Sequence, residues 1–256
     1  MQCVDCVQEG RRTTRPARTV GGARVSHRSS RPLVVPALIA VNVAVFVLTV
    51  VDARSVSANS DGAVFAATSL VPYTVAGGQW WRLVTSGFLH IGPLHLAFNM
   101  VALWVIGRDV ERVLGPLRFG AVYTAALLGG STAVMLLGAP TGAVAGASGA
   151  VFGLMGALVV LLRRMRLSPG PALAVIGVNV VLSVVLPGVS ILAHLGGLAV
   201  GALVAAGFVH GPARSRPAAG FVLAGVVVVA LLVLVGLRDL TLGPVVCDAL
   251  GTCRPG

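Results

Sequence analysis

Long apolar runs alternate with short polar segments along the chain beyond residue 31. An α-helix needs roughly 17–25 apolar residues to cross the hydrocarbon core of a bilayer, and the runs are close to this length. They lie near residues 33–51, 92–107, 117–137, 147–162, 171–186, 190–209 and 218–237. The pattern therefore predicts an all-α, polytopic transmembrane helical bundle with seven transmembrane helices.

The composition excludes a soluble globular protein. Of the 256 residues, 56% are hydrophobic and only 11% are charged, whereas soluble domains carry roughly 25% charged residues. All the basic residues are arginines, and they lie in the tails and in short loops between the apolar runs. Although the net charge is +11, this placement favours contact with the lipid bilayer, and we expect no nucleic-acid partner.

The arginines also predict the orientation of the chain. Cytoplasmic loops of membrane proteins carry an excess of Lys and Arg. Segments 108–116, 163–170 and 210–217 are rich in arginine, whereas the segments that alternate with them hold few. We therefore expect the N-terminus inside and the C-terminus outside. Arginine without lysine, in a chain rich in Ala, Val and Gly, is typical of GC-rich bacterial codon usage, so the expected location is the bacterial cell (plasma) membrane.

Both tails contain a pair of cysteines. Residues 1–31 are expected to form an Arg-rich cytoplasmic tail, in which Cys3 and Cys6 have the spacing of half a zinc knuckle. Two interpretations stay open: a pair of reduced thiols, or the last part of a zinc ribbon that begins before residue 1. Cys247 and Cys253 are expected outside the cell, where a disulfide could form.

One hydroxyl stands among small residues at the start of the fourth predicted span, in Gly146-Ala147-Ser148-Gly149. A serine in a membrane helix ordinarily bonds to a carbonyl one turn back, but glycine leaves this one open to approach. The helices after Ser148 and after His194 each carry a glycine stripe that would let them pack closely. The stripes are Gly149 and Gly153 on one helix and Gly197 and Gly201 on the other.

Close packing of these helices would make Ser148 a candidate nucleophile and His194 its base. A serine hydroxyl needs a base to accept its proton, and imidazole has a suitable pKa; the alternative is that His194 bonds a neighbouring helix. No carboxylate lies inside an apolar run, which argues against an aspartyl protease and a proton-coupled transporter. The zinc-binding motif HExxH is also absent, which excludes a zinc protease of that kind. The predicted arrangement is therefore a dyad rather than a triad.

A second polar pair is expected at the same depth in the membrane as Ser148 and His194. His95 and Asn99 are four residues apart and share one helix face. Together with the Ser148 N–H they could stabilise an oxyanion, or they could bond helices to one another. His90 precedes them at the helix entrance, where we expect a structural role.

In this combination and order, the motifs resemble the rhomboid family of intramembrane serine proteases. They are Trp81-Arg82, His90, the His95 and Asn99 pair, Glu111-Arg112, Gly146-Ala147-Ser148-Gly149, and His194 with its following glycines. The resemblance covers roughly residues 32–237. It implies a six-helix catalytic core over 32–210, followed in 211–256 by a seventh helix and a short extracytoplasmic tail.

The resemblance also implies roles for these residues. Ser148 and His194 would form the dyad, and His95, Asn99 and the Ser148 N–H, next to Gly146, would form the oxyanion site. Trp81-Arg82 would lie in a half-immersed first loop, and Glu111-Arg112 would take part in internal bonding. The expected activity is that of an intramembrane serine endopeptidase without a cofactor, which cuts single-pass transmembrane proteins near the outer membrane boundary. The alternative is an inactive rhomboid-like protein that binds transmembrane clients without cutting them.

Overall fold

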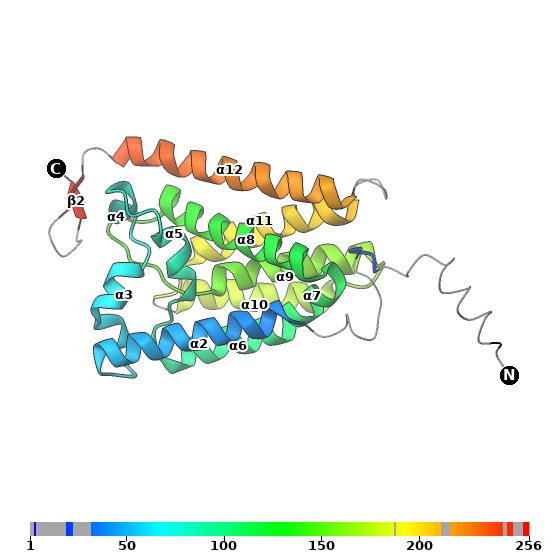
Figure 1. The fold of residues 1–256 in the computed structure, drawn as a ribbon, viewed down its shortest axis with the longest axis horizontal. Helices are drawn as coiled ribbons and strands as arrows, with labels where there is room; N and C mark the ends of the chain where they lie inside the picture. Colours follow the sequence, from blue (N-terminus) through cyan, green and yellow to red (C-terminus); the bar gives the residue numbers. More distant parts are fainter. Residues whose placement is uncertain are drawn as a thin grey trace.

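Helices cover all seven of the predicted apolar runs. The computed structural model describes residues 3, 19–22, 32–186, 188–210, 216–242, 245–247 and 253–255. The long helices are α2 (Val34–Ala53), α8 (Pro116–Leu137), α9 (Ser148–Arg164), α10 (Gly170–Val185), α11 (Ile191–His210) and α12 (Arg216–Leu242). A further helix is continuous through α6 (Gly92–Ala102), the π-helical turn η3 (Leu103–Gly107) and α7 (Arg108–Leu114). The prediction of a helical bundle is confirmed, and Figure 1 shows these helices packed side by side.

Length and composition alone assign fewer spans than seven. Among the described residues, four helices are long and apolar enough to cross a membrane: Val34–Ala53, Pro116–Leu137, Ile191–His210 and Ala218–Leu242. Helices 82–88 and 92–114 meet at 93° and would together add a fifth span. The two remaining helices are shorter, with 17 residues in α9 and 16 in α10.

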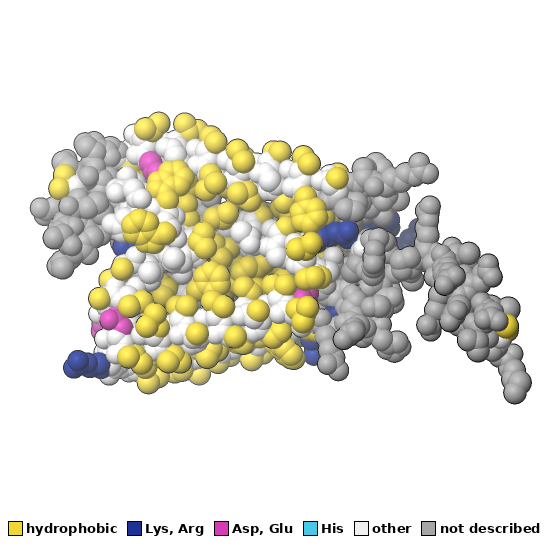
Figure 2. Space-filling view, viewed as in Figure 1, with side chains coloured by type: hydrophobic (Ala, Val, Ile, Leu, Met, Phe, Trp, Pro, Cys, Tyr) yellow, Lys and Arg dark blue, Asp and Glu magenta, His cyan; other side chains and the backbone are white. Residues whose placement is uncertain are grey.

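The surface of the bundle is apolar where its helices run together. In Figure 2 hydrophobic side chains form a broad band across the middle of the visible face, while charged side chains gather towards its two ends. The exposed hydrophobic residues include Val47 and Leu48 on α2, Val181 and Val184 on α10, and Val229 on α12. Contiguous exposed apolar surface of this kind suits a hydrocarbon solvent.

Three helices form the centre of the bundle. Helices α8, α9 and α11 pack against one another, and α12 covers the side formed by α8 and α11. Phe119 of α8, Leu154 of α9 and Phe208 of α11 are completely or almost completely buried. Helix α10 makes smaller contacts with α9 and α11, so its outer side faces away from the bundle.

The segment between α2 and α6 folds into a series of short helices at one end of the bundle (Figure 1). They are η1 (Asn59–Asp61), α3 (Ala63–Thr68), α4 (Pro72–Ala76), α5 (Arg82–Thr85) and η2 (Ser86–Phe88). Arg82 is 2% exposed and donates hydrogen bonds of 2.7 Å to the carbonyl oxygens of Ala66 and Ser69. These bonds tie α5 to the end of α3. Trp81 is exposed, and its indole Nε1–H reaches the Ala67 carbonyl at 3.3 Å.

The chain is nearly all helical, and beyond α12 it also forms one short strand pair that the sequence pattern did not predict. Strands β1 (Val245–Cys247) and β2 (Cys253–Pro255) form an antiparallel pair beyond α12. The β-branched residues Val245 and Val246 favour an extended backbone, and the reversal of the chain lets the two short segments satisfy each other's backbone groups. The register places Cys247 opposite Cys253, and a disulfide between them stays a prediction.

The N-terminal segment also touches the bundle. The Thr19 hydroxyl donates to the Val113 carbonyl at the end of α7, opposite the end that carries α3 to α5 (Figure 1). Cys3 is exposed, whereas Cys6 lies outside the described residues. The partial zinc site therefore stays a prediction.

A buried carboxylate joins α7 to the start of α2 at one end of the bundle. Glu111 is 3% exposed, and it accepts the backbone N–H groups of Leu33, Val34 and Val35 at 2.7, 2.9 and 2.9 Å. These N–H groups have no partner within helix α2, because they belong to its first turn. The negative charge also complements the helix dipole. Arg112, by contrast, forms an exposed ion pair with Asp109 at 3.1 Å.

The substitution Glu111→Gln should destabilise the protein, because an amide offers one acceptor oxygen to three N–H donors. We expect a loss of about 1–3 kcal/mol in the free energy of unfolding. The matched control is Asp109→Asn, which removes only the solvent-accessible ion pairs of Asp109 with Arg108 and Arg112 and should change the stability by less than about 1 kcal/mol. Thermal unfolding in detergent measures both variants. Equal melting temperatures for the two would show that Glu111 does not stabilise the start of α2.

Candidate active site

The first residue of α9 and a residue near the start of α11 form a direct hydrogen bond. Ser148 Oγ lies 2.7 Å from His194 Nε2, although the two residues are 46 positions apart in the chain. His194 is 5% exposed, while Ser148 is half-buried. A hydroxyl at this distance can pass its proton to the imidazole.

Close contact between helix backbones brings these two side chains together. A Cβ atom added at Gly201 would overlap the Gly153 carbonyl, and one at Gly197 would overlap the Gly149 carbonyl. A Cβ at Gly153 would lie 2.9 Å from the Gly197 carbonyl oxygen. Helices α9 and α11 therefore approach to a distance that only glycine permits at these positions. In a bilayer, such packing is a principal source of helix association.

The His194 ring is held on two further sides. It stacks on the Phe152 ring with centroids 4.1 Å apart and an interplanar angle of 11°. Its Nδ1 atom lies 2.6 Å from the hydroxyl of Ser183, a residue of α10 that is 4% exposed. The imidazole thus has a fixed plane and a bonded partner at each nitrogen.

A small space beside Ser148 is bounded by His95 and Gly146. Gly146 has a φ of +138°, a conformation that residues with a side chain rarely adopt. A Cβ added there would lie 3.0 Å from His95 Nε2 and 3.5 Å from Ser148 Oγ. Glycine therefore leaves open the volume between the hydroxyl and the histidine.

The hydrogen-bond donors around this space can be assigned. The Ile91 N–H donates to His95 Nδ1 at 3.2 Å, so in the neutral ring the hydrogen lies on Nε2, which faces Gly146. The Ser148 N–H is at the N-terminus of α9 and has no partner within that helix. An oxygen atom in the space could thus accept two hydrogen bonds and would also meet the positive end of the α9 dipole.

Two loops fix the position of Gly146. Its N–H donates to the Ser86 carbonyl at 2.9 Å. A little earlier in the same loop, Val144 and Leu70 exchange two backbone hydrogen bonds of 2.8 and 2.9 Å. The segment between α8 and α9 is therefore bonded to the segment between α2 and α6, and the conformation of Gly146 depends on both.

Asn59 positions the turn that precedes His95. Its buried amide donates to the His90 carbonyl at 2.8 Å and accepts the Gly92 N–H at 2.9 Å. This fixes the segment whose Ile91 N–H bonds the His95 ring. The completely buried His90 ring packs edge-on against His95, with centroids 5.1 Å apart. Burial, with a contribution from nearby His95, lowers the pKa of His90 to about 3, so the ring is neutral at physiological pH.

Asn99 lies on the same helix face as His95, one turn further along. It is 6% exposed, and its Nδ2 donates to the His95 carbonyl at 2.9 Å. One of its two amide hydrogens is therefore used within α6, which leaves the other for a group beside the helix.

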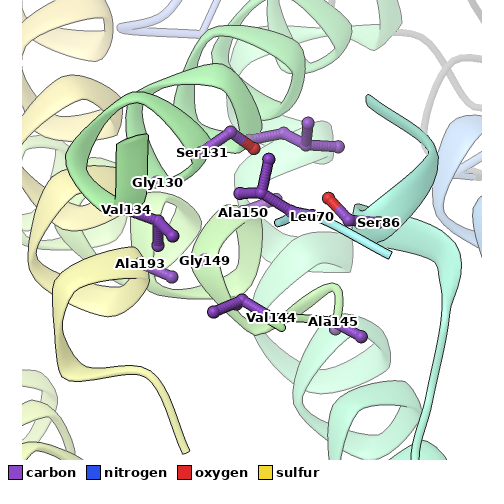
Figure 3. Close-up of a pocket in the computed structure, with 13 residues that line it drawn as sticks. Leu70, Ser86, Gly130, Ser131, Val134, Val144, Ala145, Gly149, Ala150 and Ala193 are labelled. Carbon is purple, nitrogen blue, oxygen red and sulfur yellow. The ribbon is translucent and has the colours of Figure 1, made fainter. Parts of the chain in front are cut away.

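A cavity of about 20 Å³ adjoins Gly146 on the side of α8. Figure 3 shows the hydroxyl groups of Ser86 and Ser131 at this cavity, together with the small or apolar residues Leu70, Ala150 and Ala193. The Ser131 hydroxyl donates to the Leu83 carbonyl at 2.7 Å. The volume is enough for one water molecule, and polar atoms are present on its wall.

Sequence reasoning missed four residues of this site. Phe152 could have been found, because it lies one turn after Ser148 and hence on the same helix face. Ser183 and Asn179 form a polar pair four residues apart on the otherwise apolar α10, which is a detectable pattern. The role of Asn59 left no local pattern, because the two partners through which it acts on the site, residues 90 and 92, lie more than 30 residues away.

The fold and the site together define a membrane-embedded arrangement of serine and histidine beside a donor-lined space. A sequence model described as "Rhomboid domain" matches residues 77–211, more than half of the chain. The chain therefore belongs to the rhomboid family, and it is an integral multi-pass membrane protein. The matched region ends directly after α11 (Ile191–His210), so α2 and α12 lie outside it.

Several relatives carry the word protease in their names. "Rhomboid protease GluP" of Bacillus subtilis is 43% identical over 113 residues, which cover 44% of this chain and 21% of that protein. "RHOMBOID-like protein 4" of Arabidopsis thaliana is 32% identical over 214 residues, which cover 71% of this chain and 53% of that protein. "Rhomboid protease AarA" of Providencia stuartii is 26% identical over 216 residues, which cover 71% of this chain and 74% of that protein. The chain thus spans between a fifth and about half of the length of the first two relatives.

The substitution Gly201→Ala should separate α9 from α11, because the added methyl group overlaps the Gly153 carbonyl. We expect a loss of about 1–3 kcal/mol in stability, together with slower labelling of Ser148 by a fluorophosphonate probe. The matched control is Gly177→Ala on α10, where a Cβ meets nothing within 4 Å. Alanine favours the helix there by about 0.5–1 kcal/mol. If thermal unfolding and labelling do not distinguish the two variants, the glycine contact does not set the site geometry.

Proposed function

We propose that the chain is an intramembrane serine endopeptidase in which Ser148 is the nucleophile and His194 the general base. The observation that carries this proposal is the 2.7 Å contact between Ser148 Oγ and His194 Nε2, beside a space bounded by a hydrogen-bond donor. The names of the relatives support the same class of reaction. No carboxylate is needed for the proton transfer, and no cofactor takes part.

The reaction begins when His194 Nε2 accepts the Ser148 proton and Ser148 Oγ forms a bond to the carbonyl carbon of the substrate. The π electrons of the carbonyl move to its oxygen, which becomes an oxyanion. This oxygen enters the space beside Gly146, where His95 Nε2–H and the Ser148 N–H donate to it. The free amide hydrogen of Asn99 is a third donor close to the same helix face. Fixed donors of this kind stabilise the charge that develops in the transition state.

Collapse of the tetrahedral intermediate divides the substrate. The carbonyl re-forms, the C–N bond breaks, and the imidazolium of His194 returns its proton to the leaving amine. The acyl group stays on Ser148 Oγ. His194 then takes a proton from a water molecule, whose oxygen bonds to the carbonyl carbon of the ester. The bond between this carbon and Ser148 Oγ breaks, His194 returns the proton to Ser148 Oγ, and the acyl fragment leaves as a carboxylic acid.

The expected substrates are single-pass transmembrane proteins that unwind easily near the outer membrane boundary. A helix protects its carbonyl groups through bonds to N–H groups one turn later, so the scissile peptide must leave the helical conformation. Small or helix-breaking residues lower the energy of that step. We place all seven long helices across the bilayer, with the N-terminus inside and the C-terminus outside, in a bacterial plasma membrane. Ser148, His194 and the short helices α3 to α5 then lie towards the outer side.

Cleavage should depend on both members of the dyad. With the purified protein and a single-pass membrane reporter, Ser148→Ala and His194→Ala should each lower kcat at least roughly 10³-fold, because no base or nucleophile replaces them. The matched controls are Ser57→Ala and His210→Ala, at exposed positions, which should retain activity. Cleavage by Ser148→Ala at the wild-type rate would end the protease proposal. Binding of the reporter without cleavage by the wild type would favour the inactive, client-binding alternative.

Loss of the oxyanion donor should slow the chemical step without removing the nucleophile. We expect His95→Ala to lower kcat on the order of 10²–10³-fold, and Asn99→Ala to have a smaller effect. Gly146→Ala should act like His95→Ala, because its methyl group fills the space 3.0 Å from His95 Nε2. Gly120→Ala on α8, where a Cβ meets nothing within 4 Å, is the matched control. Unchanged kcat in both His95→Ala and Gly146→Ala would refute this oxyanion site.

A further inference from the structure

We infer that Ser183 is a positioning residue for the general base: its hydroxyl accepts a hydrogen bond from His194 Nδ1–H and so holds His194 in the tautomer that can deprotonate Ser148. This inference rests on the proposed function and adds a third residue to its dyad. The dyad as expected from the sequence leaves the orientation of the imidazole to packing alone.

The direction of each hydrogen bond follows from the atoms involved. The Ser183 hydroxyl lies 2.6 Å from the Asn179 carbonyl oxygen, which can only accept, so the hydroxyl hydrogen points to Asn179. The lone pairs of Ser183 Oγ then remain for His194 Nδ1, also at 2.6 Å. Nδ1 must therefore carry the imidazole hydrogen, since a contact between two acceptors would be unfavourable.

This assignment leaves the other nitrogen ready for the reaction. With its hydrogen on Nδ1, the neutral ring has a bare Nε2, and this atom faces the Ser148 hydroxyl at 2.7 Å. The opposite tautomer would place a hydrogen on Nε2 and would leave no base for Ser148. The chain of donors thus runs in one direction, from Ser148 through His194 and Ser183 to the Asn179 carbonyl.

The same bond stabilises the charged form of the base. When Nε2 accepts the Ser148 proton, the positive charge is shared with Nδ1, and the hydrogen bond to Ser183 becomes a charge-assisted one. Ser183 neither gains nor loses a proton, because its own hydrogen stays with Asn179. A carboxylate performs this orienting role in a serine-protease triad. Here a neutral hydroxyl performs it, which avoids placing a negative charge in a site where the base is 5% exposed.

No other polar side chain is described at His194 Nδ1, so the effect should be specific. The Phe152 ring contacts the face of the imidazole and fixes its plane, but stacking cannot select a tautomer. Ser183 is 4% exposed on a helix whose neighbouring positions Val181, Leu182 and Val184 are exposed and apolar. The hydroxyl therefore faces inward, while the residues around it face outward.

Enzyme kinetics distinguish positioning from a general structural role. We expect Ser183→Ala to lower kcat roughly 10- to 100-fold, the effect of one hydrogen bond to a charged group, with KM unchanged because Ser183 does not touch the substrate. Ser183→Thr should restore most of the activity, because a threonine hydroxyl also bonds the carbonyl one turn back in a helix. The matched control is Ser168→Ala, just before the start of the same helix, which should stay within about twofold of wild type. Melting temperatures of all variants separate loss of activity from loss of folding.

The tautomer itself can be measured without any substrate. Solution NMR of the detergent-solubilised protein with 15N-labelled histidine, assigned with a His194→Gln variant, should show His194 protonated at Nδ1 and not at Nε2 at neutral pH. Ser183→Ala should give a mixture of the two tautomers, and Ser183→Thr should give the wild-type form.

The outcomes are distinguishable from failure of the proposed function. Wild-type kcat in Ser183→Ala, or a hydrogen on Nε2 of His194 in the wild-type protein, would overturn the role of Ser183 while leaving the protease proposal intact. A wild-type protein that neither cleaves the reporter nor reacts with a fluorophosphonate would instead refute the protease proposal, and the tautomer measurement would still decide the hydrogen-bond assignment.

Discussion

The contact between the backbones of α9 and α11 is the constraint on which the site depends. Lipid tails are as apolar as the side chains of these helices, so hydrophobic burial does little to press them together, and close packing must do so instead. Gly153 and Gly201 allow that packing, because any side chain at either position would meet the backbone or a side chain of a neighbouring helix. The 2.7 Å distance between Ser148 and His194 is therefore a property of the helix pair.

The buried charged side chains of the bundle are each surrounded by several hydrogen-bond partners. Glu111 is accepted in the interior because three backbone N–H groups bind its carboxylate, and Arg82 because carbonyl groups and an amide surround its guanidinium. Around His194 the available partners are hydroxyl groups and an aromatic ring. A carboxylate there would need several donors of its own, whereas a serine on a helix brings its own acceptor, the carbonyl one turn back.

The sequence allowed the helices and the central pair of the site to be predicted, since both depend on patterns within single segments. Apolar runs of membrane-spanning length located every long helix, and glycine spacing indicated which faces of α9 and α11 would meet. The remaining features depend on relations between distant segments. Ser183 reaches His194 only because α10 has a particular rotation, and Asn59 acts through bonds to residues 90 and 92. Strands β1 and β2 escaped prediction because each is only three residues long.

The loops contribute to the site as directly as the helices do. The bond from the Gly146 N–H to the Ser86 carbonyl and the pairing of Val144 with Leu70 hold the loop that contains Gly146. His95 keeps its ring orientation through Ile91, in a turn that Asn59 holds. The nucleophile and base thus depend on helix packing, whereas the oxyanion space depends on hydrogen bonds between loops at the end of the bundle. The loop bonds are the more easily disturbed of these two sources of geometry, because they compete with water at the ends of the helices and backbone contacts between buried helices do not. A perturbation at the membrane surface would therefore alter the oxyanion space before it altered the distance between Ser148 and His194.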